Sequence, residues 1–235
     1  MSTDPEQRVR HPAKFSRAIL HKLDEIVPPG VWLDPMAGVG KIFRIARTDR
    51  SFLAVEIEKP WADQHPDIIH GDAFVVLQQW VEDGTRFDGI VTSPTYGNRF
   101  ADKHNAKDDS RRHSYTHDLR AMTADSSYTL DANNSGGMYF WNDDYKQFHL
   151  ALWRLCWEVT RPGGKAFINV KNFYRTPRGK PQRVEQVVGW HIKALVATGW
   201  AAPKLTPVKT PGMRDGANNE ARVDAEQIIE VRKPA

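Results

Sequence analysis

The sequence predicts an α/β fold, in which a doubly wound, mostly parallel sheet of seven strands carries helices on both faces. Short apolar runs alternate along residues 16–94 with segments of helical periodicity, and strands that alternate with helices in this way form parallel sheets. Polar or acidic side chains follow the apolar runs, as they do at the ligand-binding edge of such a sheet. The chain has 235 residues, 40% of them hydrophobic, which suffices for one domain with a substantial core. We therefore expect a single domain over residues 1–235.

The first half of the chain predicts a leading helix and then four strands. Residues 16–27 place apolar side chains at helical spacing after Ser16, which is a suitable N-cap, and the Pro-Pro-Gly sequence that follows ends the helix. Two further helices are expected over residues 41–48 and 74–83, with a turn or short helix over 59–66. The apolar runs that we interpret as strands cover residues 31–35, 51–58, 67–73 and 87–94.

A polar stretch over residues 99–143 interrupts this alternation. It is rich in Asp, His, Lys, Arg, Ser and Asn and is too long for an ordinary connection, so it predicts an inserted segment. The pattern then resumes with a helix that ends in Arg-Pro-Gly-Gly, a fifth strand, another helix that ends at Gly199, and two last strands. These five elements are expected over residues 143–164, 165–173, 182–200, 202–209 and 226–233.

Composition excludes several classes of protein. No apolar run approaches the roughly 20 residues that a membrane span needs, and the polar N-terminal stretch lacks the apolar core of a signal peptide. The chain has one cysteine, Cys156, which excludes an internal disulfide framework and a cysteine-cluster zinc site. Its helical apolar surroundings predict a buried thiol rather than a nucleophile, and we expect a reducing, cytoplasmic location. The net charge of +4 is compatible with a polyanionic partner but does not require one.

Acidic and hydroxyl side chains follow each of the first four predicted strands, at Asp34, Glu56, Asp72 and Ser93. In a parallel sheet these positions share one edge, where ligands bind. A carboxylate at Asp34 suits an ammonium group, one at Glu56 suits the two hydroxyls of a ribose, and one at Asp72 suits an exocyclic adenine amine. Together they describe S-adenosylmethionine. Taken singly, each acid could instead be a helix cap.

The loop "DPMAGVG" joins the first strand to the next helix. Gly38 and Gly40 allow the backbone to approach a ligand closely. The dinucleotide fingerprint G-x-G-x-x-G fails at Phe43, and no G-K-[ST] follows, so neither an NAD site nor a Walker loop is predicted.

These motifs together resemble the class I S-adenosylmethionine-dependent methyltransferases, and more narrowly the amino-methylating DNA methyltransferases, including small ones encoded by phages. The resemblance covers about residues 11–232 and implies a Rossmann-like class I methyltransferase fold with S-adenosyl-L-methionine as cofactor. It implies that "HPAKF", residues 11–15, packs over the methionine part of the cofactor. The cofactor-binding residues it implies are Lys14, Phe15, Asp34, Pro35, Gly38, Gly40, Glu56, Asp72 and Ala73.

The catalytic motif of that family, [DNS]-P-P-[YFW], corresponds here to Ser93, Pro94, Thr95 and Tyr96. The resemblance implies that the Ser93 side chain and the Pro94 carbonyl accept hydrogen bonds from the target amine. It implies further that Tyr96 stacks on a base flipped out of the duplex. Thr95 departs from the usual proline, which mainly removes backbone rigidity.

The implied activity is methylation of an exocyclic amine in DNA, with double-stranded DNA as partner and a restriction-modification or solitary phage setting. A serine at the first motif position favours cytosine N4, while adenine N6 stays open. No Pro-Cys dipeptide follows the fourth strand, which argues against cytosine C5 chemistry, where a thiolate attacks the ring. Two alternatives remain: methylation of an RNA base amine, and a cofactor-binding or nucleic-acid-binding module without catalysis.

The inserted segment is expected to hold the nucleic acid, unless it is a solvated loop whose acids balance its bases. Three histidines within it (His104, His113 and His117) fit no zinc spacing, so no metal is expected. The polar loop 210–224 could line the substrate cleft through Met213 and Arg214. Candidates for phosphate contacts are Arg99, Lys103, Lys107, Arg111, Arg112 and Arg120, and candidates for base contacts are Tyr115, Tyr128, Tyr139, Phe140 and Trp141.

Overall fold

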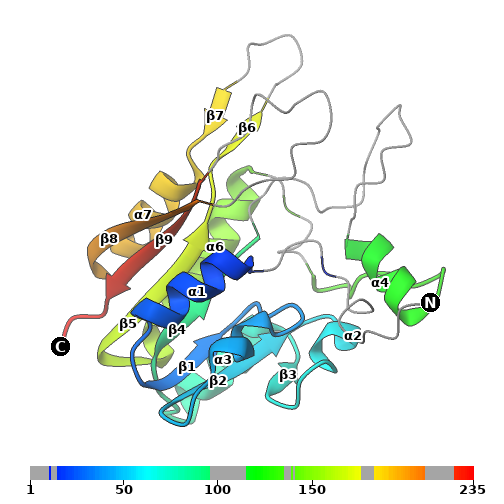
Figure 1. Cartoon of the computed structure of the whole chain (residues 1–235), viewed down its shortest axis with the longest axis horizontal. Helices are drawn as coiled ribbons and strands as arrows, with labels where there is room; N and C mark the ends of the chain where they lie inside the picture. Colours follow the sequence, from blue (N-terminus) through cyan, green and yellow to red (C-terminus); the bar gives the residue numbers. More distant parts are fainter. Residues whose placement is uncertain are drawn as a thin grey trace.

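A seven-stranded sheet forms the centre of the molecule (Figure 1). The computed structural model describes residues 11, 15–95, 115–134, 139, 141–175, 183–209 and 225–235. The strand order is β3-β2-β1-β4-β5-β9-β8, with β1 to β5 parallel, β9 antiparallel to β5, and β8 antiparallel to β9. The sheet strands are β1 (Gly30–Asp34), β2 (Arg50–Glu56), β3 (Ile68–His70), β4 (Phe87–Thr92), β5 (Thr160–Val170), β8 (Ala201–Lys209) and β9 (Ala225–Arg232).

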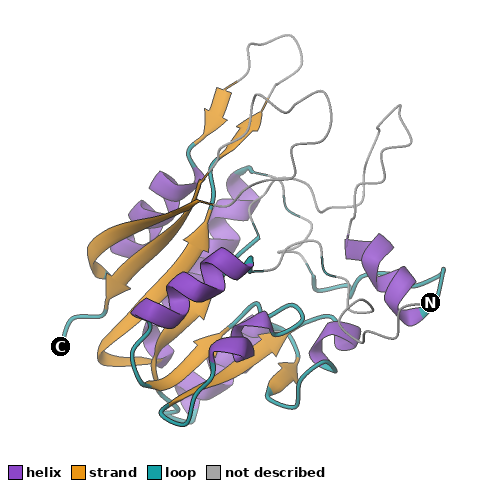
Figure 2. Cartoon of the chain, viewed as in Figure 1, coloured by secondary structure: helices purple, strands orange, loops and turns teal. Residues whose placement is uncertain are grey.

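Helices cover both faces of this sheet, as the sequence predicts (Figure 2). One face packs against α1 (Arg17–Ile26) and the 3-10 helix η2 (Lys41–Ile45), and the other against α3 (Ala73–Glu82), α6 (Asp143–Val159) and α7 (Val187–Ala197). Neighbouring residues alternate between the two cores because side chains alternate across a strand. Leu33 and Ile168 lie in the core under α3, α6 and α7, whereas Trp32 and Phe167 lie in the core under α1.

The strand order reverses at β1, and doubly wound sheets bind ligands in the crevice at such a reversal. From β1 the chain passes to β2 and β3 on one side and then returns to β4 and β5 on the other. Gly89 allows β4 to lie tightly between its neighbours: a Cβ there would stand 1.8 Å from the Lys165 carbonyl oxygen and 2.7 Å from the Trp32 ring. β4 ends at Thr92, and Ser93 follows it directly.

Four expectations about element bounds are corrected. Residues 41–48 form only the five-residue 3-10 helix η2, because the chain must turn back by Arg50 to start β2. The helix expected over 182–200 begins at Val187, since Arg183–Glu185 (β7) pairs instead with Phe173–Arg175 (β6). The Arg-Pro-Gly-Gly sequence lies within β5, which starts directly after α6, and β5 ends at Val170. The β6–β7 hairpin extends beyond the end of β5 (Figure 1).

The described part of the inserted segment packs against the β3 side of the molecule. Helix α4 (Tyr115–Thr123) lies beside the short helix α2 (Lys59–Ala62), and Leu119 and Trp61 form a small buried cluster there with Tyr128 and Leu130 packed against it (Figure 1). Cys156 is buried in α6, as expected. Across the portions of the chain that the structure describes, no helix is both long enough and apolar enough to span a membrane.

Candidate active site

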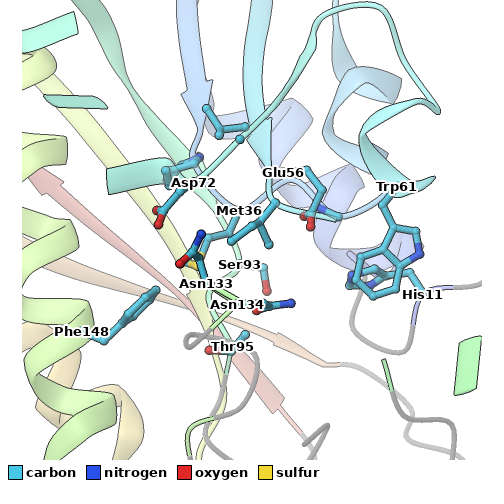
Figure 3. A pocket seen from close by; sticks show the side chains of 16 residues that line it. His11, Met36, Glu56, Trp61, Asp72, Ser93, Thr95, Asn133, Asn134 and Phe148 are labelled. Atoms are coloured by element: carbon cyan, nitrogen blue, oxygen red, sulfur yellow. The ribbon is translucent and has the colours of Figure 1, made fainter. Parts of the chain in front are cut away.

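A cavity lies at the carboxyl ends of β1, β2 and β4, between the sheet and the described part of the insert (Figure 3). Its empty volume of about 720 Å³ includes space that is open to solvent. His11 and Trp61 stand at one end and Phe148 at the other (Figure 3). Glu56, Asp72 and Ser93 all line it, so three of the four polar strand ends predicted from sequence meet in one space.

Asp34, the fourth of these residues, ends β1 and does not itself line the cavity. Its neighbours Pro35 and Met36 line the cavity, and its Oδ1 accepts a hydrogen bond from the Met36 amide at 3.1 Å. The side chain is 1% exposed, and this burial raises its pKa to about 7. A carboxyl group so placed gains most from a cation nearby, because the cation would favour its charged form.

Glu56 holds the glycine loop in place from the end of β2. Its Oε2 accepts from the Gly38 amide at 2.8 Å and its Oε1 from the Glu58 amide at 2.9 Å. Burial raises its pKa to about 7 despite these two bonds. A carboxylate can accept about four hydrogen bonds, so Glu56 retains capacity toward a ligand in the cavity.

Asp72 combines the two interpretations that the sequence left open. It is the N-cap of α3, where its Oδ1 accepts from the Phe74 amide at 2.8 Å, and it also lines the cavity together with Ala73. The cap therefore fixes the position of the carboxylate at the N-terminus of α3.

Gly38 lines the cavity next to the aromatic rings of His11 and Trp61. Its φ of +54° lies in the left-handed region, and a Cβ there would stand 2.9 Å from the His11 ring. The His11 ring in turn meets the Trp61 ring edge-on, with centroids 4.1 Å apart. His11 belongs to the "HPAKF" stretch, so the first residue of this stretch does reach the cavity.

The described residues of the predicted catalytic motif lie on the cavity wall after β4. Ser93 and Thr95 line the cavity, and Pro94 is buried between them. The Ser93 hydroxyl lies 3.4 Å from Asn169 Nδ2, which donates to it from the end of β5. The Thr95 carbonyl accepts a hydrogen bond of 2.6 Å from the Tyr145 hydroxyl.

Glu58 anchors part of the insert over the cavity. It is fully buried, and its carboxylate accepts hydrogen bonds from the Tyr128 hydroxyl at 2.8 Å, the Asp131 amide at 3.0 Å and Asn134 Nδ2 at 2.7 Å. Burial, followed by the hydrogen bond to Glu58, raises the pKa of Tyr128. Asn133 and Asn134, at the end of this 128–134 segment, line the cavity. The insert therefore contributes a wall to the same site.

Other residues singled out from sequence lie elsewhere. Phe15 is buried in the core under α1, and Gly40 lies against Phe43 and Ile68, so neither lines the cavity. Arg120 donates to the Tyr128 carbonyl at 2.8 Å. The ring of Trp141 packs on that of Tyr145. The remaining candidates lie outside the described residues or have undescribed side chains: Lys14, Tyr96, Arg99, Lys103, His104, Lys107, Arg111, Arg112, His113, Tyr115, His117, Phe140, Met213 and Arg214.

Sequence reasoning missed Glu58, Asn133, Asn134 and Phe148. Glu58 follows Glu56 by two residues, but β2 ends at Glu56 and Glu58 is the N-cap of α2. Nothing in the sequence indicates that Asn133 and Asn134 return to β2. Among the residues that the structure describes, no group of His, Cys, Asp or Glu side chains could hold a metal ion.

Comparisons with known proteins bear on the fold. A solved S-adenosylmethionine-dependent methyltransferase from Archaeoglobus fulgidus superposes with a TM-score of 0.54 at 11% identity, over 92% of this chain and 93% of that one. The chain has the Rossmann-like class I methyltransferase fold. The strand order and the antiparallel β9 agree with this assignment. No protein-family model matches the sequence, and a comparison with curated proteins gave no match.

Weaker likenesses extend to two Thermus thermophilus proteins. TrmN superposes with a TM-score of 0.48 at 11% identity, over 91% of this chain and 47% of its own. A putative DNA modification methylase, solved with S-adenosyl-L-methionine, gives 0.41 at 18% identity, over 70% of this chain and 52% of its own. The chain thus spans about half the length of either protein.

Proposed function

We propose that the chain transfers a methyl group from S-adenosylmethionine to an exocyclic amine of a DNA base, with cytosine N4 favoured over adenine N6. One observation carries the proposal: Ser93 and Thr95 of the predicted catalytic motif line the same cavity as Glu56 and Asp72 of the predicted cofactor site. A methyl donor and an acceptor amine bound to these two groups of residues would share one space.

The residues present fit this cofactor. Glu56 offers carboxylate oxygens for a ribose diol, and the flat rings of His11 and Trp61 stand beside it (Figure 3). Asp72 and Ala73 lie on the β3 side of the cavity, where an adenine amine would find an acceptor. Asp34, with its pKa raised to about 7 by burial, would be ionised by a nearby ammonium group. When bound, S-adenosylmethionine would supply an electrophilic methyl group.

The motif residues would orient the target amine and draw electron density toward its nitrogen. The Ser93 hydroxyl and the Pro94 carbonyl would accept hydrogen bonds from the two N–H groups, while the Tyr96 ring would stack on the flipped base. Asn169 donates to Ser93 and so directs the remaining lone pair of that hydroxyl. Most of the rate enhancement would then come from positioning and electrostatics rather than from a general base.

DNA as substrate is supported by the resemblance of the Ser93–Tyr96 motif to amino-methylating DNA enzymes and by the basic side chains of residues 99–120. The 128–134 segment already forms one wall of the cavity, so the insert joins the cofactor side of the site to the residues proposed to hold the polymer. A single domain of this size suits a short recognition sequence.

The test is mass spectrometry of nucleosides from DNA of a host that lacks DNA methylation and expresses the chain. We expect N4-methylcytosine or N6-methyladenine in cells with the wild-type chain and in neither the empty host nor cells with Ser93→Ala. RNA from the same cells is digested in parallel. Methylated RNA with unmodified DNA would move the assignment to an RNA base. Two unmodified polymers, with purified protein that binds S-adenosylmethionine, would leave a binding module.

A further inference from the structure

Three fully buried side chains from α6 and α7 form a continuous chain of hydrogen bonds that ends on the predicted catalytic motif. Trp153 Nε1 donates to His191 Nδ1 at 3.1 Å, and His191 Nε2 lies 2.9 Å from the Tyr145 hydroxyl. That hydroxyl lies 2.6 Å from the Thr95 carbonyl oxygen. None of the three side chains lines the cavity.

The protons in this chain can be placed from the chemistry of its ends. An indole N–H only donates, so His191 Nδ1 must accept and the neutral ring carries its proton on Nε2. His191 Nε2 then donates to the Tyr145 oxygen, and the Tyr145 hydroxyl is left to donate to Thr95. Burial lowers the pKa of His191 well below its usual value, which agrees with a neutral ring. Every donor points toward the motif.

Thr95 is the motif residue with most need of such a restraint. The pyrrolidine ring of Pro94 fixes its own φ, but Thr95 has no ring. The Thr95 carbonyl belongs to the peptide group that joins Thr95 to Tyr96. Because this group is planar, a restraint on the oxygen also restrains the orientation of the whole peptide group. The rigid anchor lies in the packed interface of α6 and α7, two of the helices that cover the sheet.

We propose that Tyr145, His191 and Trp153 are positioning residues, which fix the Thr95 peptide and thereby set the rate of methyl transfer without touching cofactor or base. The inference rests on the proposed function for its kinetic part. Its structural part, the restraint on Thr95, can be measured without any turnover.

Tyr145→Phe is the decisive variant, because it keeps the ring and its packing and removes only the hydroxyl. Without its donor the Thr95 peptide samples other orientations, and only the fraction in the productive one reacts. We expect kcat to fall by about tenfold, the loss of one buried hydrogen bond, with the KM for S-adenosylmethionine unchanged. Tyr174→Phe, the same change at a partly exposed tyrosine of β6, should leave kcat unchanged.

The restraint itself is measured by NMR. Thr-Tyr occurs once in the sequence, at residues 95 and 96, so carbonyl-¹³C threonine combined with ¹⁵N tyrosine gives a single HNCO signal, from this peptide. In Tyr145→Phe the Thr95 carbonyl resonance should move upfield as its hydrogen bond is lost, and in Tyr174→Phe it should stay. His191→Gln, whose amide can still donate to Tyr145, should keep more activity than His191→Leu, which cannot.

Two results would overturn the proposal: an unmoved Thr95 resonance in Tyr145→Phe, or a kcat that equals that of Tyr174→Phe. A role limited to packing of α6 on α7 predicts a lower melting temperature with kcat unchanged at permissive temperature, and also counts against it. A wild-type chain that transfers no methyl group contradicts the proposed function instead, and the Thr95 resonance then decides alone whether Tyr145 restrains the motif.

Discussion

Asp34 and Glu56 are two buried carboxyl groups whose pKa values burial raises to about 7, yet their surroundings differ. Glu56 already holds two backbone amides, those of Gly38 and Glu58, so the ligand contact that we propose for it cannot be separated from its structural role. Asp34 holds one amide, that of Met36. The two residues should therefore respond differently to removal of their charge.

Truncating the ligand separates these roles. Asp34→Asn should weaken S-adenosylmethionine binding by about tenfold or more, because it removes the attraction between a carboxylate and a nearby ammonium group, and should leave adenosine binding unchanged, because adenosine has no ammonium group. Glu56→Gln should weaken both ligands, because both carry the ribose diol. Calorimetric titration of each variant with each ligand measures this, and an equal loss of both ligands in Asp34→Asn would contradict the role of Asp34.

Residue by residue, the predictable part of the site is the part that ends a strand. Asp34, Glu56, Asp72 and Ser93 each close an apolar run, and strand ends meet at one edge by geometry. The positioning residues Tyr145, His191 and Trp153 could not be found in this way. Tyr145, for example, is part of the apolar repeat of α6. From sequence it looks like an ordinary core residue, and nothing indicates that its hydroxyl contacts the loop after β4.

At the scale of elements, the 128–134 segment is held to the site by one carboxylate. Glu58→Ala would remove the acceptor that the Tyr128 hydroxyl, the Asp131 amide and the Asn134 side-chain amide share, and loss of a hydrogen bond to a charged group costs about 1.5–3 kcal/mol where it is buried, as it is at Asn134. We expect faster hydrogen exchange over residues 128–134, with β1 and β4 still protected, and weaker cofactor binding.

Hydrogen-exchange mass spectrometry with and without S-adenosylhomocysteine measures this effect. Glu82→Ala, on the exposed end of α3, is the matched control and should match the wild type. Unchanged exchange over 128–134 in Glu58→Ala would mean that the apolar contacts of Tyr128 and Leu130 suffice to hold the segment.

The elements that the sequence predicted well are mainly the strands that helices cover on both faces of the sheet, because burial on both faces requires a run of apolar residues. All seven sheet strands were found, most of them as apolar runs bounded by polar turns, although β8 is largely exposed. The η2 and β7 segments were not, because their conformation depends on partners distant in sequence. Residues 183–185 carry a pattern compatible with the following helix, and only pairing with β6 makes them a strand.

For the whole molecule, four buried groups among the described residues make stability depend on pH between about 4 and 8. Asp34 and Glu56, with raised pKa values, hold protons that the unfolded chain releases, so their contribution is full below about pH 4 and is lost as pH rises through about 7. His149 and His191 have pKa values lowered by burial, to about 4 for His149, so their contribution is present above about pH 6.5 and is lost as pH falls.

The carboxyl groups and the histidines change the free energy of unfolding in opposite directions as pH rises, and their sum can be predicted. From about pH 4.5 to 6.5 the proton differences nearly cancel, and the free energy of unfolding should be almost flat. Above about pH 6.5 the carboxyl groups dominate, and it should fall by about 1 kcal/mol by pH 8. Removing both carboxyl groups, in Asp34→Asn with Glu56→Gln, leaves the two histidines unopposed, so stability should rise with pH from about 5 to 6.5, where that of the wild type is flat. Urea unfolding at a series of pH values measures both slopes.

The control is the exposed pair Asp144→Asn with Glu82→Gln, which should keep the wild-type dependence of stability on pH. If the variant Asp34→Asn with Glu56→Gln keeps that dependence as well, Asp34 and Glu56 are ionised at neutral pH without any ligand.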